Sequence, residues 1–169
     1  MNISNDMGLL YKLASEFRGL IEVCVDAEEE FPLLWDDFPI NACKPISMLF
    51  AYHLQKLGLD TSIECVLGFS SRRTDNIGHW WVQVNGVLID LTADQFNVIQ
   101  DGDLSYKLKM HRPYESVYCC DVSKSPHRLV FKIDQRNSFV FNCDDLHSDY
   151  FFDFERAYNL LMECRDQCE

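Results

Sequence analysis

The segment HWWVQVNGVLIDLT, residues 79–92, constrains the fold of this chain more than any other stretch. Two apolar runs flank the dipeptide Asn85-Gly86, an arrangement typical of a β-hairpin closed by a two-residue type I′ turn. The turn fixes the pairing, so that Trp81 lies opposite Asp90. Every side chain of the hairpin is thereby assigned to one face of a sheet.

The two faces of this predicted hairpin differ in chemistry. One face is uniformly apolar and is expected to pack against the core: Trp80, Val82, Val84, Val87, Ile89 and Leu91. The other face is mixed and is expected to lie away from the core: His79, Trp81, Gln83, Leu88, Asp90 and Thr92. There Asp90 is the diagonal neighbour of His79, at a backbone separation of about 7–8 Å that the two side chains can bridge. A carboxylate in that place orients an imidazole and stabilises its protonated form.

A second strong pattern predicts a helix over about residues 44–57. Its apolar stripe consists of Ile46, Leu49, Phe50, His53, Leu54 and Leu57. On this stripe His53 is expected to be a buried, hydrogen-bonded histidine. Pro45 suits the first turn, and Gly58 follows as a left-handed C-terminal cap. Cys43 is the only one of the eight cysteines expected at a helix N-terminus, where unpaired N–H groups and the helix dipole favour a thiolate.

The remaining segments complete a predicted α+β fold with an antiparallel sheet. Helical spacing predicts amphipathic helices near both ends of the chain, over residues 5–24 and 149–165. Further strands are expected over residues 61–69, 115–122, 127–134 and 138–143. The acidic run of residues 26–30 is expected to be a solvated connection. Residues 70–78 are expected to be a polar loop, and residues 98–112 a loop with short structure. No repeat or linker divides the chain, so residues 1–169 are expected to form a single domain.

Charge and composition exclude several classes of function. The 169 residues carry a formal net charge of −12 without a basic run, which argues against binding nucleic acid or an anionic membrane surface. No run approaches the roughly 18 apolar residues of a membrane-spanning helix, and Asp6 stands where an export signal would be positively charged. The chain is therefore expected in the cytoplasm with reduced cysteines. None of these cysteines has the paired C-x₂-C spacing of structural zinc, so neither a metal nor another cofactor is predicted.

Two segments resemble blocks of the transglutaminase-like cysteine enzymes, part of the papain-like superfamily. FPINACKPISMLFAYHLQKLG resembles the helix that opens with the nucleophilic cysteine, and GHWWVQVNGVLIDLTADQF resembles the strands with the catalytic histidine and aspartate. The order Cys43, His79, Asp90 matches the order in the family, and the resemblance covers roughly residues 38–97. It implies a transglutaminase-like/papain-like fold, in which the nucleophile helix packs on an antiparallel β-sheet with flanking N- and C-terminal helices.

The resemblance also implies acyl transfer. Cys43 would attack an amide or thioester carbonyl, His79 would shuttle the proton, and Asp90 would orient His79. The acyl group would pass to water, as in peptidases, amidases and deamidases, or to an amine, as in transglutaminases and N-acyltransferases. Hydrolysis of an amide is the favoured prediction.

Three further residues are candidates for contacting the substrate: Asn41, Trp81 and Gln95. Such sequences often have glycine where this chain has Asn41, a residue that tolerates a tight backbone turn, and its amide would add a donor to an oxyanion hole. Trp81 shares the face of His79 and would wall a substrate pocket, with a packing role equally open. Gln95 would line the cleft, with a helix-capping or turn role after Asp90 as the alternative.

A binding protein is the alternative to an enzyme. The charge of −12 suits a basic partner, so the chain could be an acidic inhibitor or immunity-type protein on a degenerate scaffold of the same fold. As an enzyme it is expected to act on a protein or peptide, and the same charge favours a basic substrate. Neither nucleic acid nor a membrane is an expected partner, and the sequence leaves the oligomeric state open.

Overall fold

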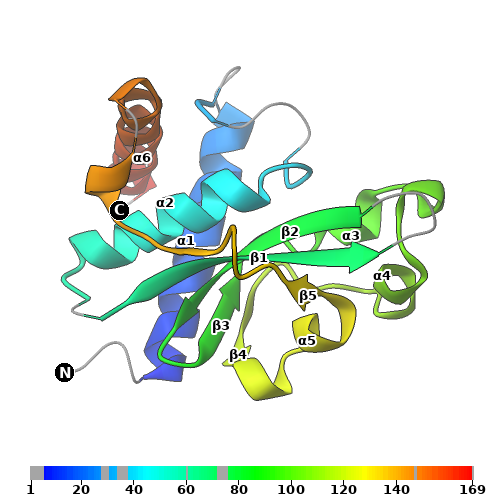
Figure 1. Ribbon diagram of the computed structural model, residues 1–169. Helices are drawn as coiled ribbons and strands as arrows, with labels where there is room; N and C mark the ends of the chain where they lie inside the picture. The colour runs from blue at the N-terminus through cyan, green and yellow to red at the C-terminus, as the bar shows by residue number, and fades with distance from the viewer. Residues whose placement is uncertain are drawn as a thin grey trace.

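The computed structural model describes residues 6–27, 31–33, 38–59, 61–71, 76–146 and 148–168. These residues form an α+β fold, as predicted, in which one open sheet carries helices on both faces (Figure 1). The described strand pairs are antiparallel and follow the order β4-β3-β2-β1-β5, with β6 also paired to β1. The strands are β1 Ile63–Ser71, β2 Asn76–Val84, β3 Val87–Asp90, β4 Tyr118–Asp121, β5 Lys132–Ile133 and β6 Phe139–Val140.

Helices of very different length accompany the sheet. Within the described residues they are α1 Met7–Ala27, α2 Cys43–Lys56, α3 Gln95–Val98, α4 Tyr106–Met110, α5 His127–Val130 and α6 Ser148–Cys168. Short 3₁₀ turns occur at Asp101–Asp103, Val122–Lys124 and Cys143–Asp145. Asp6 Oδ1 caps the start of α1 by accepting a hydrogen bond from the backbone N–H of Leu9 at 3.1 Å. Gly58 follows α2 with φ 75, the left-handed conformation predicted for it.

The hairpin register is confirmed. Val84 pairs with Val87 and Val82 pairs with Ile89. Asn85 and Gly86 have φ values of 47 and 77, as a type I′ turn requires. The side chains of β2 and β3 are therefore divided between the two faces as the sequence predicts.

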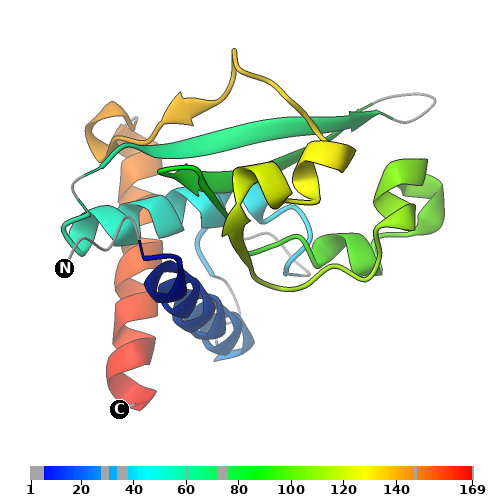
Figure 2. The ribbon, with the colours of Figure 1, turned by 90° about the horizontal axis from the view of Figure 1, so that it is seen from below.

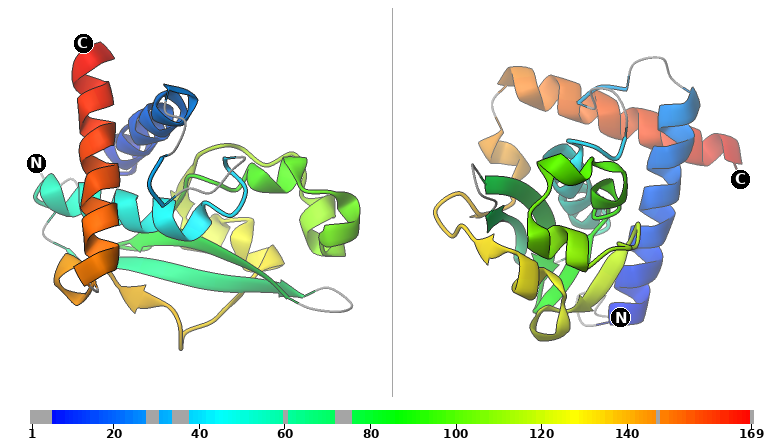
Figure 3. Two further views of the ribbon diagram at one scale, coloured as in Figure 1. Left: turned by 90° about the horizontal axis from the view of Figure 1, so that it is seen from above. Right: turned by 90° about the vertical axis from the view of Figure 1, so that its right-hand side faces the viewer.

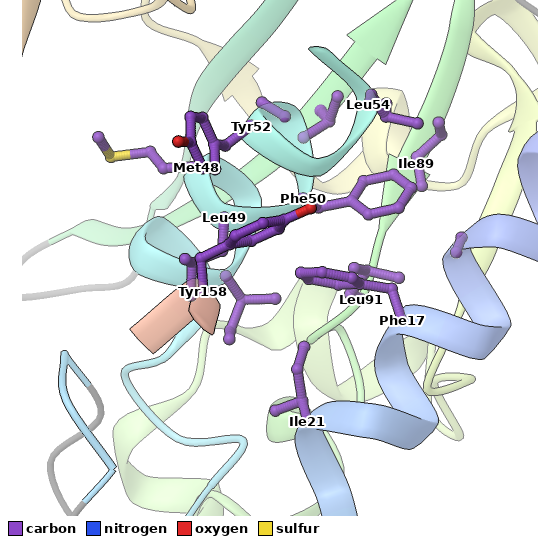
Figure 4. Close-up of a cluster of buried hydrophobic side chains, with 14 of the residues drawn as sticks. Phe17, Ile21, Met48, Leu49, Phe50, Tyr52, Leu54, Ile89, Leu91 and Tyr158 are labelled. Carbon is purple, nitrogen blue, oxygen red and sulfur yellow. The ribbon is translucent and has the colours of Figure 1, made fainter. Parts of the chain in front are cut away.

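The face of the sheet that carries Val82 and Ile89 is covered by the three long helices α1, α2 and α6 (Figures 1 and 3). Their apolar stripes meet the sheet in one cluster, which we call the first core. Figure 4 shows how side chains from all these elements converge: Phe17 and Ile21 from α1, Leu49 and Phe50 from α2, Ile89 and Leu91 near the end of the hairpin, and Tyr158 from α6. This core is the one that the sequence predicts.

The prediction that the opposite face lies away from the core is wrong. That face is covered by α3, α4, α5 and the chain between them, and Figure 2 shows α5 (yellow) lying across the sheet. The buried apolar side chains there form a second core: Val66, Trp81, Leu88, Ala93, Phe96, Leu104, Leu108, Tyr114, Val130 and Phe131. The covering helices have only four or five residues each, so no amphipathic period in the sequence reveals them.

The prediction of a strand over residues 127–134 is also wrong in its first half. His127–Val130 is the helical turn α5, and only Lys132 and Ile133 pair with β1, as β5. The strands predicted over 115–122 and 138–143 are confirmed in shortened form, as β4 and β6.

Two predicted connections lie partly outside the described residues. In the acidic run, residues 28–30 are outside, and Asp26 is exposed. The predicted loop 70–78 is shorter than expected, because β1 and β2 take up both of its ends, and its residues 72–75 are outside. Among the helices of the described segments, none is both long enough and apolar enough to cross a membrane.

Candidate active site

Cys43 is the first residue of α2, and its side chain is largely buried, with 9 % exposed. The chain reaches it through a turn in which Asn41 has φ 60, a left-handed conformation that asparagine tolerates better than most residues with a side chain. Ala42 is the N-cap and supplies no side-chain hydrogen bond, so the N–H groups of the first helical turn are left to other acceptors. The side chain of Asn41 is exposed, and its contact with substrate stays a prediction.

His79 and Asp90 meet as the hairpin register predicts. His79 Nε2 lies 2.6 Å from Asp90 Oδ2, and both side chains are fully buried. Thr92 donates its backbone N–H to Asp90 Oδ1 at 2.9 Å, and its hydroxyl lies 3.3 Å from the same oxygen. The turn after β3 therefore holds one oxygen of the carboxylate, while the imidazole binds the other.

Burial and charge act in opposite directions on this pair. Burial lowers the pKa of His79, but the charge of Asp90 and their hydrogen bond outweigh it and, with the interaction of the Cys43 side chain, raise the pKa of the ring. Burial raises the pKa of Asp90, but the charge of His79 and the hydrogen bonds from His127 and His79 hold this pKa well below its usual range. The pair therefore favours the carboxylate form of Asp90 and the protonated form of His79.

Gln95 lies against the other nitrogen of the same ring. Its Nε2 is 2.9 Å from His79 Nδ1, and the residue is buried at the start of α3. Asp90 occupies Nε2 of His79 and Gln95 lies against Nδ1, so each nitrogen of the ring has a partner. Gln95 therefore contacts the candidate base itself, and its predicted contact with substrate is untested.

Trp81 shares the face of His79, as predicted, but it is buried in the second core with 1 % exposed. Its ring packs against His127 and Phe131, with centroid separations of 5.3 and 5.7 Å. Among the described residues its Nε1 has no hydrogen-bond partner. One side of Trp81 also lines a cavity of about 220 Å³ beside Leu88. Packing is therefore the observed role, and a contact with substrate stays a prediction.

His127 is a second histidine of the site that the sequence does not reveal. Its Nε2 lies 2.7 Å from Asp90 Oδ2, the same oxygen that His79 contacts, and the residue is buried. The Ser125 hydroxyl lies 3.0 Å from His127 Nδ1. No motif surrounds His127, and the sequence pattern of its segment predicts a strand. The helical turn α5 instead brings His127 to Asp90.

Arg18 of α1 contacts both the turn after β3 and the turn before α2, the chain segments on the two sides of the site. It makes a two-pronged ion pair with Asp94, at 2.8 and 3.0 Å, and Asp94 belongs to the turn after β3. Its guanidinium carbon lies 4.5 Å from the ring centroid of Phe38, in the turn that precedes Cys43. A single arginine on the otherwise apolar stripe of α1 is the sequence signal that could reveal this role.

The same cluster contains residue types that bind metals. His79, Asp90 and His127 offer ligand atoms that all lie within 4.8 Å of one another. The two Nε2 atoms are, however, only 2.6 and 2.7 Å from one carboxylate oxygen. A tetrahedral zinc ion at about 2.0–2.1 Å from its ligands holds neighbouring donor atoms about 3.3 Å apart. The distances are those of a hydrogen-bonded cluster.

The fold and the site together define a class: an α+β protein with a buried His–Asp pair beside a cysteine that opens a helix. No protein-family model matches this chain, and no curated protein or solved structure matches it either. The resemblance to transglutaminase-like enzymes therefore stays a prediction from the sequence.

Proposed function

We propose that this protein is a cysteine-dependent acyl-transfer enzyme of transglutaminase-like fold that hydrolyses amide bonds. The observation that carries the proposal is the 2.6 Å contact between His79 Nε2 and Asp90 Oδ2, beside a cysteine at the N-terminus of α2. The architecture adds support, because α2 packs on an antiparallel sheet between the terminal helices α1 and α6.

In the proposed reaction the Cys43 sulfur attacks the amide carbonyl carbon, while His79 Nδ1 takes the thiol proton. Asp90 keeps the other ring proton on Nε2 and stabilises the imidazolium. When the carbon–nitrogen bond breaks, His79 gives its proton to the leaving amine, and a thioester remains on Cys43. Water then attacks the thioester with His79 as base, which releases the acid and the free thiol. Backbone N–H groups at the start of α2 stabilise the oxyanion in both steps.

The proposed substrate is a protein or peptide of basic character. Support comes from the formal net charge of −12, which attracts cationic substrates. Cys43 is 9 % exposed, whereas His79 is 0 % exposed. In the proposal the substrate therefore reaches the Cys43 sulfur from the surface, and the imidazole of His79 lies deeper in the protein. The proposed location is the cytoplasm, in keeping with the free thiols of Cys43, Cys65, Cys119, Cys120 and Cys143.

Alkylation by iodoacetamide tests the nucleophile directly. At mildly acidic pH, Cys43 is expected to react ahead of every other thiol, since burial raises the pKa of Cys119 to about 11 and raises that of Cys120. His79→Ala should abolish this selective reaction, and Cys119→Ser should leave it intact. The modified residue is identified by peptide mass spectrometry. Equal reactivity of all accessible thiols in the wild type and in His79→Ala would refute the proposal.

Hydrolysis of a library of lysine- and arginine-rich peptides tests the reaction class. Release of new amine and carboxyl ends is expected with the wild type and not with Cys43→Ala. Transfer to added amines in place of hydrolysis would reassign the acceptor without changing the roles of Cys43, His79 and Asp90. A tight stoichiometric complex with a basic protein that forms equally well with Cys43→Ala, with no turnover, would instead favour the acidic inhibitor.

A further inference from the structure

The carboxylate of Asp90 serves two imidazoles at one oxygen. His79 Nε2 lies 2.6 Å from Oδ2 and His127 Nε2 lies 2.7 Å from it. Oδ1 is occupied separately by the backbone N–H and hydroxyl of Thr92. The second imidazole is therefore not needed to fill an empty acceptor on the carboxylate. It competes with the proposed catalytic ring for the same oxygen.

The ring of His127 is fixed from several sides. The Ser125 oxygen accepts the backbone N–H of His127 at 3.0 Å, and the same hydroxyl lies 3.0 Å from Nδ1. Trp81 and Tyr118 pack edge-on against the ring, each at a centroid separation of 5.3 Å. When the Ser125 hydroxyl donates to Nδ1, the ring hydrogen is on Nε2 and points to Asp90. The contacts thus select the tautomer that donates to the carboxylate.

We propose that His127 is a positioning residue that sets the proton affinity of His79 by sharing Asp90 Oδ2. A carboxylate oxygen that accepts two hydrogen bonds divides its negative charge between them, so each donor is held less strongly than it would be alone. The imidazolium of His79 is then less stable than beside an unshared aspartate. A base that releases its proton more readily suits general acid–base catalysis near neutral pH. The catalytic meaning rests on the proposed function, whereas the effect on His79 does not.

The other ionisable groups around the two rings do not account for such tuning. From β4, Tyr118 contacts His127, and Cys120 interacts with Ser125, but burial raises the pKa of both, so they are neutral near pH 7. From α2, Cys43 acts on His79 and not on the Asp90 oxygen that the rings share. The charge that both imidazoles face is that of Asp90.

Titration of His79 by NMR in His127→Phe tests this inference. Phenylalanine keeps a ring of similar size but donates no hydrogen bond to Asp90, which Thr92 continues to anchor. The pKa of His79 is expected to rise by about one pH unit, the equivalent of one charge-assisted hydrogen bond that is no longer shared. The His79 Nε2 proton should move downfield. The alkaline limb in the pH profile of Cys43 alkylation should also shift to higher pH. A loss of packing alone would not produce this shift.

Two variants make the result specific. His127→Gln places an amide N–H near the position of Nε2 and should restore the wild-type pKa of His79. His53→Phe removes another buried imidazole, which bonds to Tyr158, and should leave the His79 pKa unchanged. An unchanged His79 pKa in His127→Phe, or an equal shift in His53→Phe, would overturn the inference.

Measurements on the wild type keep the inference testable even if His127→Phe does not fold. Nitrogen chemical shifts should show His127 with its hydrogen on Nε2 and bonded to Asp90, and the tautomer with hydrogen on Nδ1 would overturn the inference. One equivalent of tightly bound zinc that is lost in both His127→Gln and His79→Gln would also overturn it, because an ion would then join the three side chains. If Cys43 is unreactive in every variant but the His79 shift is found, the proposed function fails and this inference stands.

Discussion

The two faces of the sheet are both buried, but by different chemistry. Over the first face, three long helices supply an apolar core in which His53 lies with Nδ1 3.0 Å from the Tyr158 hydroxyl. Over the second face, short helices enclose a smaller apolar cluster and a fully hydrogen-bonded group around Asp90. The first arrangement makes a stable scaffold, and the second holds buried ionisable side chains because Asp90, His79 and His127 are hydrogen-bonded to one another.

Two buried histidines show what this difference means for chemistry. Burial, assisted by the charge of Arg165 and opposed by Glu16, lowers the pKa of His53 to about 4, so the ring is neutral. Burial acts in the same direction on His79, but Asp90 reverses its effect and raises the pKa. A buried imidazole is therefore a packing group or a base depending on whether a carboxylate is buried with it.

The largest expected effect on stability is the loss of a leucine from the first core. Leu49→Ala should reduce the free energy of unfolding by about 3–5 kcal/mol, because the surrounding helices cannot close the cavity. Leu88→Ala on the second face should reduce it by about 2 kcal/mol, because Leu88 already lines a cavity. Urea unfolding measures both, with Leu129→Ala, 60 % exposed, as a control that should change little. Equal losses of unfolding free energy in Leu49→Ala and Leu88→Ala would contradict the inference that the two faces of the sheet are packed differently.

Removal of the buried charge should affect the second face alone. Asp90→Asn leaves two imidazole donors facing an amide and is expected to lower the free energy of unfolding by about 2–4 kcal/mol and Cys43 reactivity by about 10²-fold or more. Asp121→Asn is the matched control, since that carboxylate also accepts a backbone N–H two residues ahead, from Ser123 at 2.7 Å, but is exposed. A change of less than about 1 kcal/mol is expected there. Asp90→Asn with normal reactivity would contradict the role of the carboxylate.

The two histidines should give stability opposite dependences on pH. The pKa of His53 falls from 6.5 in the unfolded chain to about 4, so the unfolded state binds more protons between these values. The free energy of unfolding should therefore fall by about 2 kcal/mol as the pH drops through this window, after allowance for solvent screening. His53→Leu should remove this pH-dependent decrease. The pKa of His79 is raised, so its stabilisation is complete below pH 6.5 and is lost as the pH rises through the folded value. His79→Gln should remove this alkaline loss, and urea unfolding across pH measures both slopes.

The sequence predicts those parts of the site that depend on local patterns. The Asn85-Gly86 turn fixes the hairpin register, and the register alone brings His79 to Asp90. The stripe of α2 in the same way predicts a cysteine at a helix N-terminus and a buried His53. Each of these inferences needs only a short period or a turn, and such signals are contained in neighbouring residues.

The sequence could not predict the parts that depend on the packing of short, irregular segments. His127 reaches Asp90 across 37 residues, through a helical turn of four residues that has no period of its own. The same short helices bury Trp81 and His79, so the face that the sequence predicts to lie away from the core is a second core. Arg18 is similar, because its partner Asp94 belongs to a turn that only the tertiary fold places beside α1.

The smallest expected effect is at the hairpin turn, which belongs to neither face. Gly86 has φ 77 and open space around its α-carbon, so Gly86→Ala should lower the free energy of unfolding by about 1 kcal/mol through backbone strain alone. Gly102 has equal space without a positive φ, and Gly102→Ala should therefore change stability very little. Cys43 alkylation should keep its pH profile in both variants, because the two cores hold β2 and β3 in register from either side. A shifted profile in Gly86→Ala alone would mean that the turn, and not the packing of the two faces, keeps His79 beside Asp90.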